Sequence, residues 1–165
     1  MLSRRLFLTA AAVVLSLSAP LRAEDAQIHV MDPYARTMGG IGASGAAFFM
    51  LHNMGTADDR LVGARADVAQ RVELHTHVMN AEGVMSMVEV KDGFPVPAGG
   101  THELKRGADH VMLMGLTREL KQGDSFPLTL VFESGAEITV DVPVDNDRKP
   151  AEGGMDMTHG APSGG

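Results

Sequence analysis

The chain has 165 residues, a formal net charge of −7 and no cysteine. An acidic chain is poorly suited to bind nucleic acid or an anionic membrane surface, and the lack of cysteine excludes disulfides, thiol redox chemistry and a cysteine nucleophile. Methionine is frequent, with 12 residues, and its thioether is a soft metal ligand that cannot form a disulfide.

Residues 1–23 are predicted to be a secretory signal peptide, so the mature protein is expected to be exported from the cytoplasm. Arg4 and Arg5 form a charged start, an apolar run follows over 6–17, and Ala19 or Ala23 offers a small residue for cleavage. The run is too short for a lasting transmembrane helix, so no stable membrane insertion is expected after cleavage; a retained anchor is the alternative. The letters S-R-R-L-F-L also resemble a twin-arginine signal, so the Sec and twin-arginine export routes both stay open.

The mature chain is predicted to fold as one domain over residues 24–144. Cleavage after residue 23 removes three arginines and no acidic residue, so 142 residues remain with a formal charge of −10. Short alternating or apolar runs stand between Gly, Pro, Asn and Asp punctuators, and no segment keeps a helical period for three turns. The runs are 46–52, 71–79, 84–90, 110–116, 126–132 and 136–144. This pattern predicts an all-β fold, an antiparallel β-sandwich with Greek-key connections.

The run 71–79 carries two histidines and a methionine on one face. Apolar side chains alternate with His75, His77 and Met79, so the apolar set is expected in the core and the His/Met set outside. Met85 and Met87 likewise share one face of the following strand.

A short loop decides whether these two faces coincide. Residues 81–83, Ala-Glu-Gly, can form a three-residue hairpin loop with the glycine in the left-handed conformation. His77 is then opposite Met87, and Met79 is opposite Met85. A four-residue loop would turn the methionines to the other face.

A third strand adds ligands of the same kind. His110, Met112 and Met114 share a face, and the hairpin register makes His75 a diagonal neighbour of Met87. The pattern predicts a site of two histidines and two methionines. Imidazole with neutral thioether suits Cu(I), whereas zinc favours thiolate or carboxylate and a blue-copper centre needs a cysteine.

Several segments resemble the PCu(A)C family of periplasmic copper chaperones: V-E-L-H, G-V-M-S-M, V-P-A-G, L-K-R-G and H-V-M-L-M-G-L. The likeness extends over about 28–144, and the signature of that family is His, ten residues, Met, twenty-one residues, then His-x-Met. Carried over, the resemblance implies Cu(I) ligands at His75, Met87, His110 and Met112. It also implies a cupredoxin-like fold and a carrier rather than an enzyme. Such a carrier delivers copper to the binuclear copper centre of cytochrome c oxidase, often alongside a Sco-type protein.

The spacing departs from that signature in two loops. Eleven residues separate His75 from Met87, and twenty-two separate Met87 from His110. The sequence therefore does not decide whether His75 or His77 is the fourth ligand. Two other functions share the same ligands: a copper buffer for resistance without a dedicated acceptor, and a copper-dependent redox enzyme, for which the sequence shows no acid/base groups nearby.

Residues 145–165 are predicted to be a disordered tail, because Gly, Pro and charged residues dominate them. The tail carries Met155, Met157 and His159 in M-D-M-T-H, which predicts a second copper site for Cu(I) or, with Asp156, Cu(II).

The remaining candidates receive structural interpretations. Tyr34 and Arg36 are interpreted as structural residues. Three methionines are interpreted as side chains that pack around the ligands and shield them: Met79, Met85 and Met114. The alternative is that they form a second ring of sulfur ligands that passes the ion on. Three histidines are expected on the surface or in hydrogen bonds rather than at a metal: His29, His52 and His102.

Overall fold

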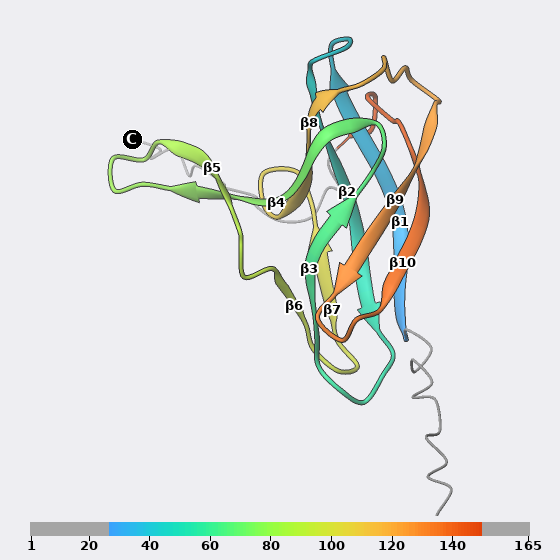
Figure 1. The fold of residues 1–165 in the computed structure, drawn as a ribbon. Coiled ribbons are helices and arrows are strands. Elements are labelled where there is room, and N and C mark those ends of the chain that lie inside the picture. The colour runs from blue at the N-terminus through green and yellow to red at the C-terminus, as the bar shows by residue number, and fades with distance from the viewer. Residues whose placement is uncertain (1–26, 150–165) are drawn as a thin grey trace, which may run out of the picture.

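The structure is a computed structural model that describes residues 27–149. This part of the chain forms ten strands and no helix, so it has no helix that could cross a membrane (Figure 1). The strands are β1 (Ile28–Met38), β2 (Ser44–Asn53), β3 (Asp59–Arg65), β4 (Ala69–Met79), β5 (Met85–Glu89), β6 (Phe94–Val96), β7 (Thr101–Leu104), β8 (His110–Leu116), β9 (Ser125–Phe132) and β10 (Glu137–Pro143).

Two sheets pack face to face. The larger has six strands in the order β1-β2-β8-β4-β5, with β7 also paired with β2, and the smaller has the order β10-β9-β3-β6. All named strand pairs are antiparallel, and most neighbours in the sheets are distant in sequence, as Greek-key connections require. The predicted all-β antiparallel sandwich is confirmed.

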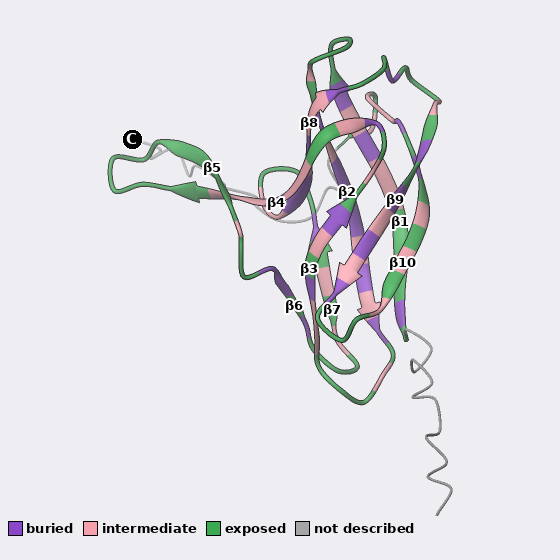
Figure 2. Cartoon of the chain, viewed as in Figure 1, coloured by how far each residue is buried: buried purple, intermediate pink, exposed green. Residues whose placement is uncertain are grey.

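The core lies between the sheets, where one side chain of every two points inward. In β9 the pattern alternates strictly, so that Phe126, Leu128 and Leu130 are buried while their neighbours are not. Leu51 and Leu113 supply the facing side from the larger sheet, and both are fully buried. Figure 2 shows that the buried residues are concentrated in the sandwich body. The outer face of the larger sheet is left free to carry polar and thioether side chains.

The β4–β5 hairpin projects from the sandwich body (Figure 1). Asn80 and Val84 close its loop through the Asn80 N–H, which donates to the Val84 carbonyl at 3.0 Å. Gly83 occupies the left-handed region with φ of 78°, a conformation that glycine adopts without steric penalty. Every residue of β5 is exposed (Figure 2), so loop geometry and strand pairing, rather than burial, hold the hairpin in place.

The hairpin register agrees with the three-residue loop expected from the sequence. His77 is the partner of Met87, and Met79 is the partner of Met85. The histidines of β4 and the methionines of β5 therefore share one face of the ribbon.

The end of the described chain is held against the domain. The Arg36 guanidinium donates to the Asn146 carbonyl at 2.7 Å, and the guanidinium of Arg148 forms an ion pair with Asp32. Residues 145–149 thus contact the sandwich. The predicted signal peptide and residues 150–165 of the predicted tail lie outside the described range, so the division of the chain at residue 145 stays a prediction.

Candidate metal centre

The candidate ligands lie on the outer face of the larger sheet, where β2, β8 and β4 run side by side. Met112 of β8 is the partner of Ala46 on one side and of Glu73 on the other. His110, two residues earlier, is the partner of His75. Directly opposed residues point to the same side of a sheet, so both rows project outward. The sheet register alone thus brings two imidazoles and a thioether together.

A pocket of about 520 Å³ opens beside these rows. It is lined by four of the predicted site residues, His77, Met87, His110 and Met112, whereas His75 is not among its lining residues. The other lining residues are Arg36, Met38, Ser44, Gly45, Ala46, Phe48, Arg106 and Gly107. Among the lining residues that the structure describes there is no carboxylate, so the soft and nitrogen ligands that they offer are thioether and imidazole.

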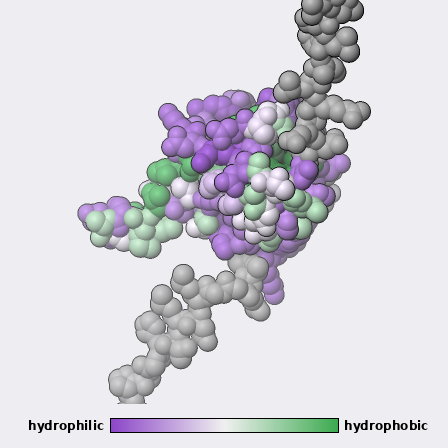
Figure 3. Space-filling view, turned by 90° about the horizontal axis from the view of Figure 1, so that it is seen from below, coloured by the Kyte–Doolittle hydropathy of each residue, from purple (hydrophilic) through white to green (hydrophobic). Residues whose placement is uncertain are grey.

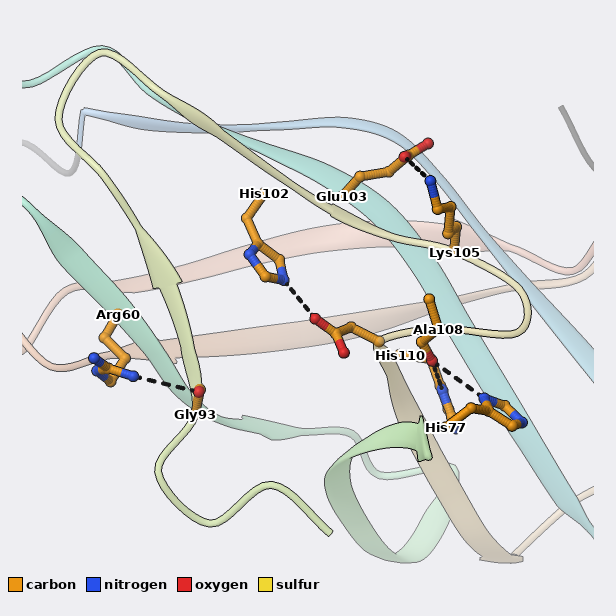
Figure 4. A network of polar contacts seen from close by, with 9 residues as sticks. Arg60, His77, Gly93, His102, Glu103, Lys105, Ala108 and His110 are labelled. Carbon is orange, nitrogen blue, oxygen red and sulfur yellow. Dashed lines mark hydrogen bonds and ion pairs between the residues drawn. The ribbon is translucent and has the colours of Figure 1, made fainter. Parts of the chain in front are cut away.

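One backbone carbonyl orients two of the imidazoles. Nδ1 of His110 lies 2.8 Å from the Ala108 carbonyl oxygen, and Nδ1 of His77 lies 3.3 Å from the same atom (Figure 4). A carbonyl oxygen only accepts hydrogen bonds, so each Nδ1 carries the proton. The lone pair of each neutral ring is then on Nε2. Fixing the tautomer through the second nitrogen is the usual way in which proteins prepare a histidine ligand.

His110 is buried although it lies on the outer face. Its residue exposure is 2 %, and its ring centroid lies 6.2 Å from that of Phe48 and 5.2 Å from that of His77. Burial lowers the pKa of His110 below its ordinary value of 6.5, and the hydrogen bond to the Ala108 carbonyl opposes that shift only in part. Because only the neutral ring can bind a metal, the lowered pKa keeps His110 ready as a ligand in mildly acidic solution.

His75 presents the opposite nitrogen. Its Nε2 lies 2.9 Å from a carboxylate oxygen of Glu73, which also forms an ion pair with Arg71 at 3.6 Å. Nε2 therefore carries the proton, and the lone pair is on Nδ1, which is buried without a hydrogen-bond partner in the described structure. The rings of His75 and His110 meet edge to face with centroids 6.0 Å apart. A buried nitrogen without a partner is destabilising, and a bound metal ion would satisfy it.

The flanking methionines differ in exposure. Met79 is 67 % exposed and Met85 is 48 % exposed, so much of the surface of each residue is open to solvent. Whether these two shield the ligands or form a second ring stays a prediction. Met114 is half-buried, and its sulfur accepts from the Arg71 guanidinium at 3.4 Å.

Three pocket residues were not expected from the sequence. Met38 contributes a thioether that is 87 % exposed, and Arg36 and Arg106 bring positive charge to the lining. Arg36 lines the pocket and also makes the structural contact with Asn146 already described. These residues come from β1 and from the loop before β8, and no local sequence pattern connects them with the histidines.

Tyr34 has a structural environment, as expected. Its ring lies 5.0 Å from that of Phe48 and 4.3 Å below the guanidinium carbon of Arg148. Burial raises the pKa of Tyr34 above its ordinary value of 10.0, although the nearby arginines oppose the shift.

The isolated histidines stay outside the pocket. His102 is 2.9 Å from a carboxylate oxygen of Asp109 (Figure 4), and His29 pairs with His52 across β1 and β2. Among residues 27–149, no three His, Asp or Glu side chains gather closely enough to hold a metal ion.

Sequence comparison identifies the family. The sequence profile described as "Putative lipoprotein LpqE-like" matches residues 28–144, well over half of the chain. The chain belongs to the LpqE-like family. This LpqE-like chain is 36 % identical over 138 residues to "Putative lipoprotein Lxx21020" of Leifsonia xyli subsp. xyli, which covers 83 % of the chain and 81 % of that relative.

Solved structures share the fold of the LpqE-like chain. The Cu(I) form of DR1885 from Deinococcus radiodurans is 32 % identical with a TM-score of 0.55, covering 72 % of this chain and 79 % of that one. The apo form is 28 % identical with a TM-score of 0.57, covering 89 % and 97 %. The copper-bound PCuAC domain of PmoF2 is 22 % identical with a TM-score of 0.57 over 72 % and 92 %, a likeness of fold alone. The expected cupredoxin-like fold is confirmed.

Proposed function

We propose that this LpqE-like protein is a carrier of Cu(I). The observation that supports the proposal is the composition of the pocket, which combines Met87, Met112 and His110, with no carboxylate among its described lining residues and no cysteine in the sequence. Neutral thioether and imidazole select a soft monovalent ion and disfavour zinc, calcium or magnesium. The structural relative described as the Cu(I) form of DR1885, at 32 % identity, supports the same ion.

The proposed ligands are His75, Met87, His110 and Met112. His77 lines the pocket and is the alternative to His75, but its free Nε2 can be solvated there. The lone pair of His75 is on a buried Nδ1 without a partner, so ion binding removes a penalty that His77 does not carry. This difference favours His75 as the resident ligand and leaves His77 at the edge of the site.

Titration with Cu(I) against a competing chelator tests the site. Replacing Met87 and Met112 together by Leu removes two sulfur ligands and preserves apolar volume. We expect the affinity to fall at least about 100-fold, beyond the 10–100-fold loss typical of second-shell partners. The matched control is Met31→Leu with Met54→Leu, which changes two exposed methionines outside the pocket. Wild-type affinity in the Met87/Met112 variant would refute the proposed site.

Single histidine variants separate the two alternatives for the fourth ligand. His75→Ala should weaken Cu(I) binding more than His77→Ala in the same titration. The reverse order would assign the fourth position to His77, whose ring already lines the pocket.

Transfer to a partner distinguishes a chaperone from a buffer. Neutral ligands beside a surface pocket can be displaced one at a time by incoming thiolates. This favours transfer to a Cys/His acceptor such as the binuclear copper centre of cytochrome c oxidase, alone or with a Sco-type protein. Rapid-mixing spectroscopy with the oxidase copper domain should show transfer from the loaded protein. Tight loading without transfer to any cysteine-containing copper acceptor would instead support a copper buffer.

An enzymatic function is not favoured. A copper-dependent redox enzyme requires acid/base groups beside the ion to manage protons. Apart from the imidazoles themselves, the ionisable side chains of the described pocket are the guanidiniums of Arg36 and Arg106, which stay protonated.

We further propose that the protein is exported to the periplasm, in line with the signal-like residues 1–23 and with relatives described as lipoproteins. None of its 165 residues is a cysteine that could carry a thioether-linked lipid. Fusing residues 1–30 to a reporter that is active only outside the cytoplasm tests export. Loss of export in an Arg4→Lys, Arg5→Lys variant would indicate the twin-arginine route, and retained export the Sec route.

The tail is proposed to hold a second copper ion through Met155, Met157 and His159. These residues lie outside the described range, but the chain approaches them from beside the pocket, since Arg106 donates to the Arg148 carbonyl at 3.5 Å. Deleting residues 150–165 should lower total copper stoichiometry and leave the main Cu(I) site intact. Unchanged stoichiometry for both Cu(I) and Cu(II) would show that the tail has no site.

A further inference from the structure

The face of the hairpin that carries the histidines continues outward beyond the proposed site. His77 and Met87 form one cross-strand pair, and Met79 and Met85 form the next pair on the same face. Successive pairs on one face are separated by two residues, or about 7 Å along the ribbon. The ribbon thus presents ligands in a row that leads from the sheet toward the hairpin tip.

The exposure of the outer pair argues against a packing role. Met79 and Met85 keep 67 % and 48 % of their surface exposed, and Met87 keeps 50 %. An apolar side chain stabilises a fold by losing contact with water, so these three methionines contribute little to stability. Figure 3 shows mildly hydrophobic residues on the surface of the projecting hairpin.

The two faces of the hairpin differ in the kind of apolar residue they carry. Val78 pairs with Ser86 and Thr76 pairs with Val88, so the second face bears branched aliphatic side chains, 39 % and 40 % exposed at the two valines. All three hairpin methionines lie on the histidine face instead. If the hairpin needed only an apolar surface to bind a partner, methionine and valine would serve equally well on either face. A need for sulfur ligands explains why the methionines are confined to the histidine face.

We propose that Met79 and Met85 form an outer Cu(I) station through which the ion enters and leaves the main site. The inference rests on the proposed Cu(I) function and adds a second, weaker site to it. Two neutral sulfurs suit a soft monovalent ion, and because they are fewer than the four ligands of the main site we expect them to hold it more weakly, as a transit position requires. Neither sulfur offers the oxygen ligands that Mg²⁺ or Ca²⁺ requires.

Movement between the stations needs only ligand exchange. As the ion moves inward, the sulfur of Met87 or the Nε2 of His77 binds it before the sulfur of Met79 or Met85 releases it. The oxidation state of copper does not change. Methionine has three rotatable bonds and adapts its reach, so exposed side chains on a paired ribbon can bridge the step between rows. Met87 belongs both to the main site and to this row.

Methyl resonances of methionine provide a direct test in the full-length protein. With ¹³C-methyl labelling and assigned signals, Ag(I) serves as a redox-inert analogue of Cu(I). The first equivalent should shift the methyl signals of Met87 and Met112, and further Ag(I) should shift those of Met79 and Met85 together.

The outcomes separate the two proposals. If the signals of Met79 and Met85 stay unmoved in excess Ag(I) while Met87 and Met112 respond, the outer station is refuted and the main site stands. If Met87 and Met112 do not respond to the first equivalent, the proposed function itself fails.

A kinetic experiment tests the transit role. In the Met79→Leu, Met85→Leu variant, the equilibrium affinity of the main site for Cu(I) should match wild type. Removal of Cu(I) by the chelator bicinchoninate should slow about tenfold, equivalent to roughly 1.4 kcal/mol in the barrier. The matched control is again Met31→Leu with Met54→Leu, whose rate should equal that of wild type. An unchanged rate in the hairpin variant would contradict a transit role.

Discussion

The sandwich body and the projecting hairpin share strand β4, and they use it differently. Leu74 and Val78 lie on the same face of β4, yet Leu74 is 4 % exposed in the core and Val78 is 39 % exposed in the hairpin. On the other face, the His75 side chain is 14 % exposed and Met79 is 67 % exposed. Pairing continues along the strand after burial has ended. Burial therefore constrains the side chains of the body. In the hairpin, strand pairing fixes the backbone position of each residue and leaves its side chain exposed to solvent.

The largest expected loss of stability comes from a substitution in the core of the sandwich body. Leu113 of β8 is fully buried in the core, two strands away from the hairpin edge. Leu113→Ala removes buried methyl groups and leaves a cavity, so the free energy of unfolding should fall by about 2–5 kcal/mol. Urea unfolding followed by circular dichroism measures the change. A loss below about 1 kcal/mol would mean that the sheets repack around the cavity.

Two glycines give a matched comparison between the regions. Gly93, where the chain returns to the body, has φ of 73°, and a Cβ there would lie 2.2 Å from the Leu61 carbonyl oxygen. Gly83 in the hairpin loop has φ of 78° and no atom within 4 Å of such a Cβ. Both alanine variants carry the left-handed penalty of about 1–2 kcal/mol, but only Gly93→Ala adds a clash with backbone. Gly93→Ala should therefore lower the free energy of unfolding by more than about 2 kcal/mol, and Gly83→Ala by less. Equal losses would contradict the local difference in packing.

The sequence predicted the hairpin well because its signals are local. The alternation over 71–79 and the glycine three residues after Asn80 specify face and register without help from distant contacts. The fold class follows from the same kind of pattern. The observed partners of His77 and Met79 confirm this part of the analysis.

The environment of the site could not be predicted in the same way. The Ala108 carbonyl that orients two imidazoles is a backbone group with no signature in sequence. The alternation over 71–79 places Glu73 on the outward face with His75, but the contact of its carboxylate with Nε2 of His75 depends on side-chain rotamers, which the pattern does not specify. Arg36 and Arg106 reach the pocket from separate elements, so only the assembled sheet and loop bring them together.

A smaller effect should appear in the dependence of stability on pH. Burial lowers the pKa of His110 in the folded protein below 6.5, so the unfolded chain takes up a proton that the folded chain does not. Stability of the copper-free protein should therefore be unaffected by this group above about pH 6.5, fall as the pH drops below it, and level off below the lowered pKa. Urea unfolding across this window measures the slope.

Variants assign that slope to the buried ring. His110→Gln removes the titrating group and should flatten the slope, whatever its effect on absolute stability. His29→Gln changes an exposed histidine and should leave the slope unchanged. A slope that survives in His110→Gln would assign the proton uptake to another group.

The smallest effect is expected within the hairpin. Val88 lies opposite Thr76, is 40 % exposed and faces away from the methionine row. Its truncation to Ala removes little buried surface and no hydrogen bond, so the free energy of unfolding should change by no more than about 0.5 kcal/mol. Affinity for Cu(I) should equal that of wild type, because no proposed ligand shares its face. A loss as large as that of Leu113→Ala, measured by the same urea unfolding, would mean that the valine face is covered in solution. In that case sedimentation at several protein concentrations would show whether a second copy of the chain provides the cover.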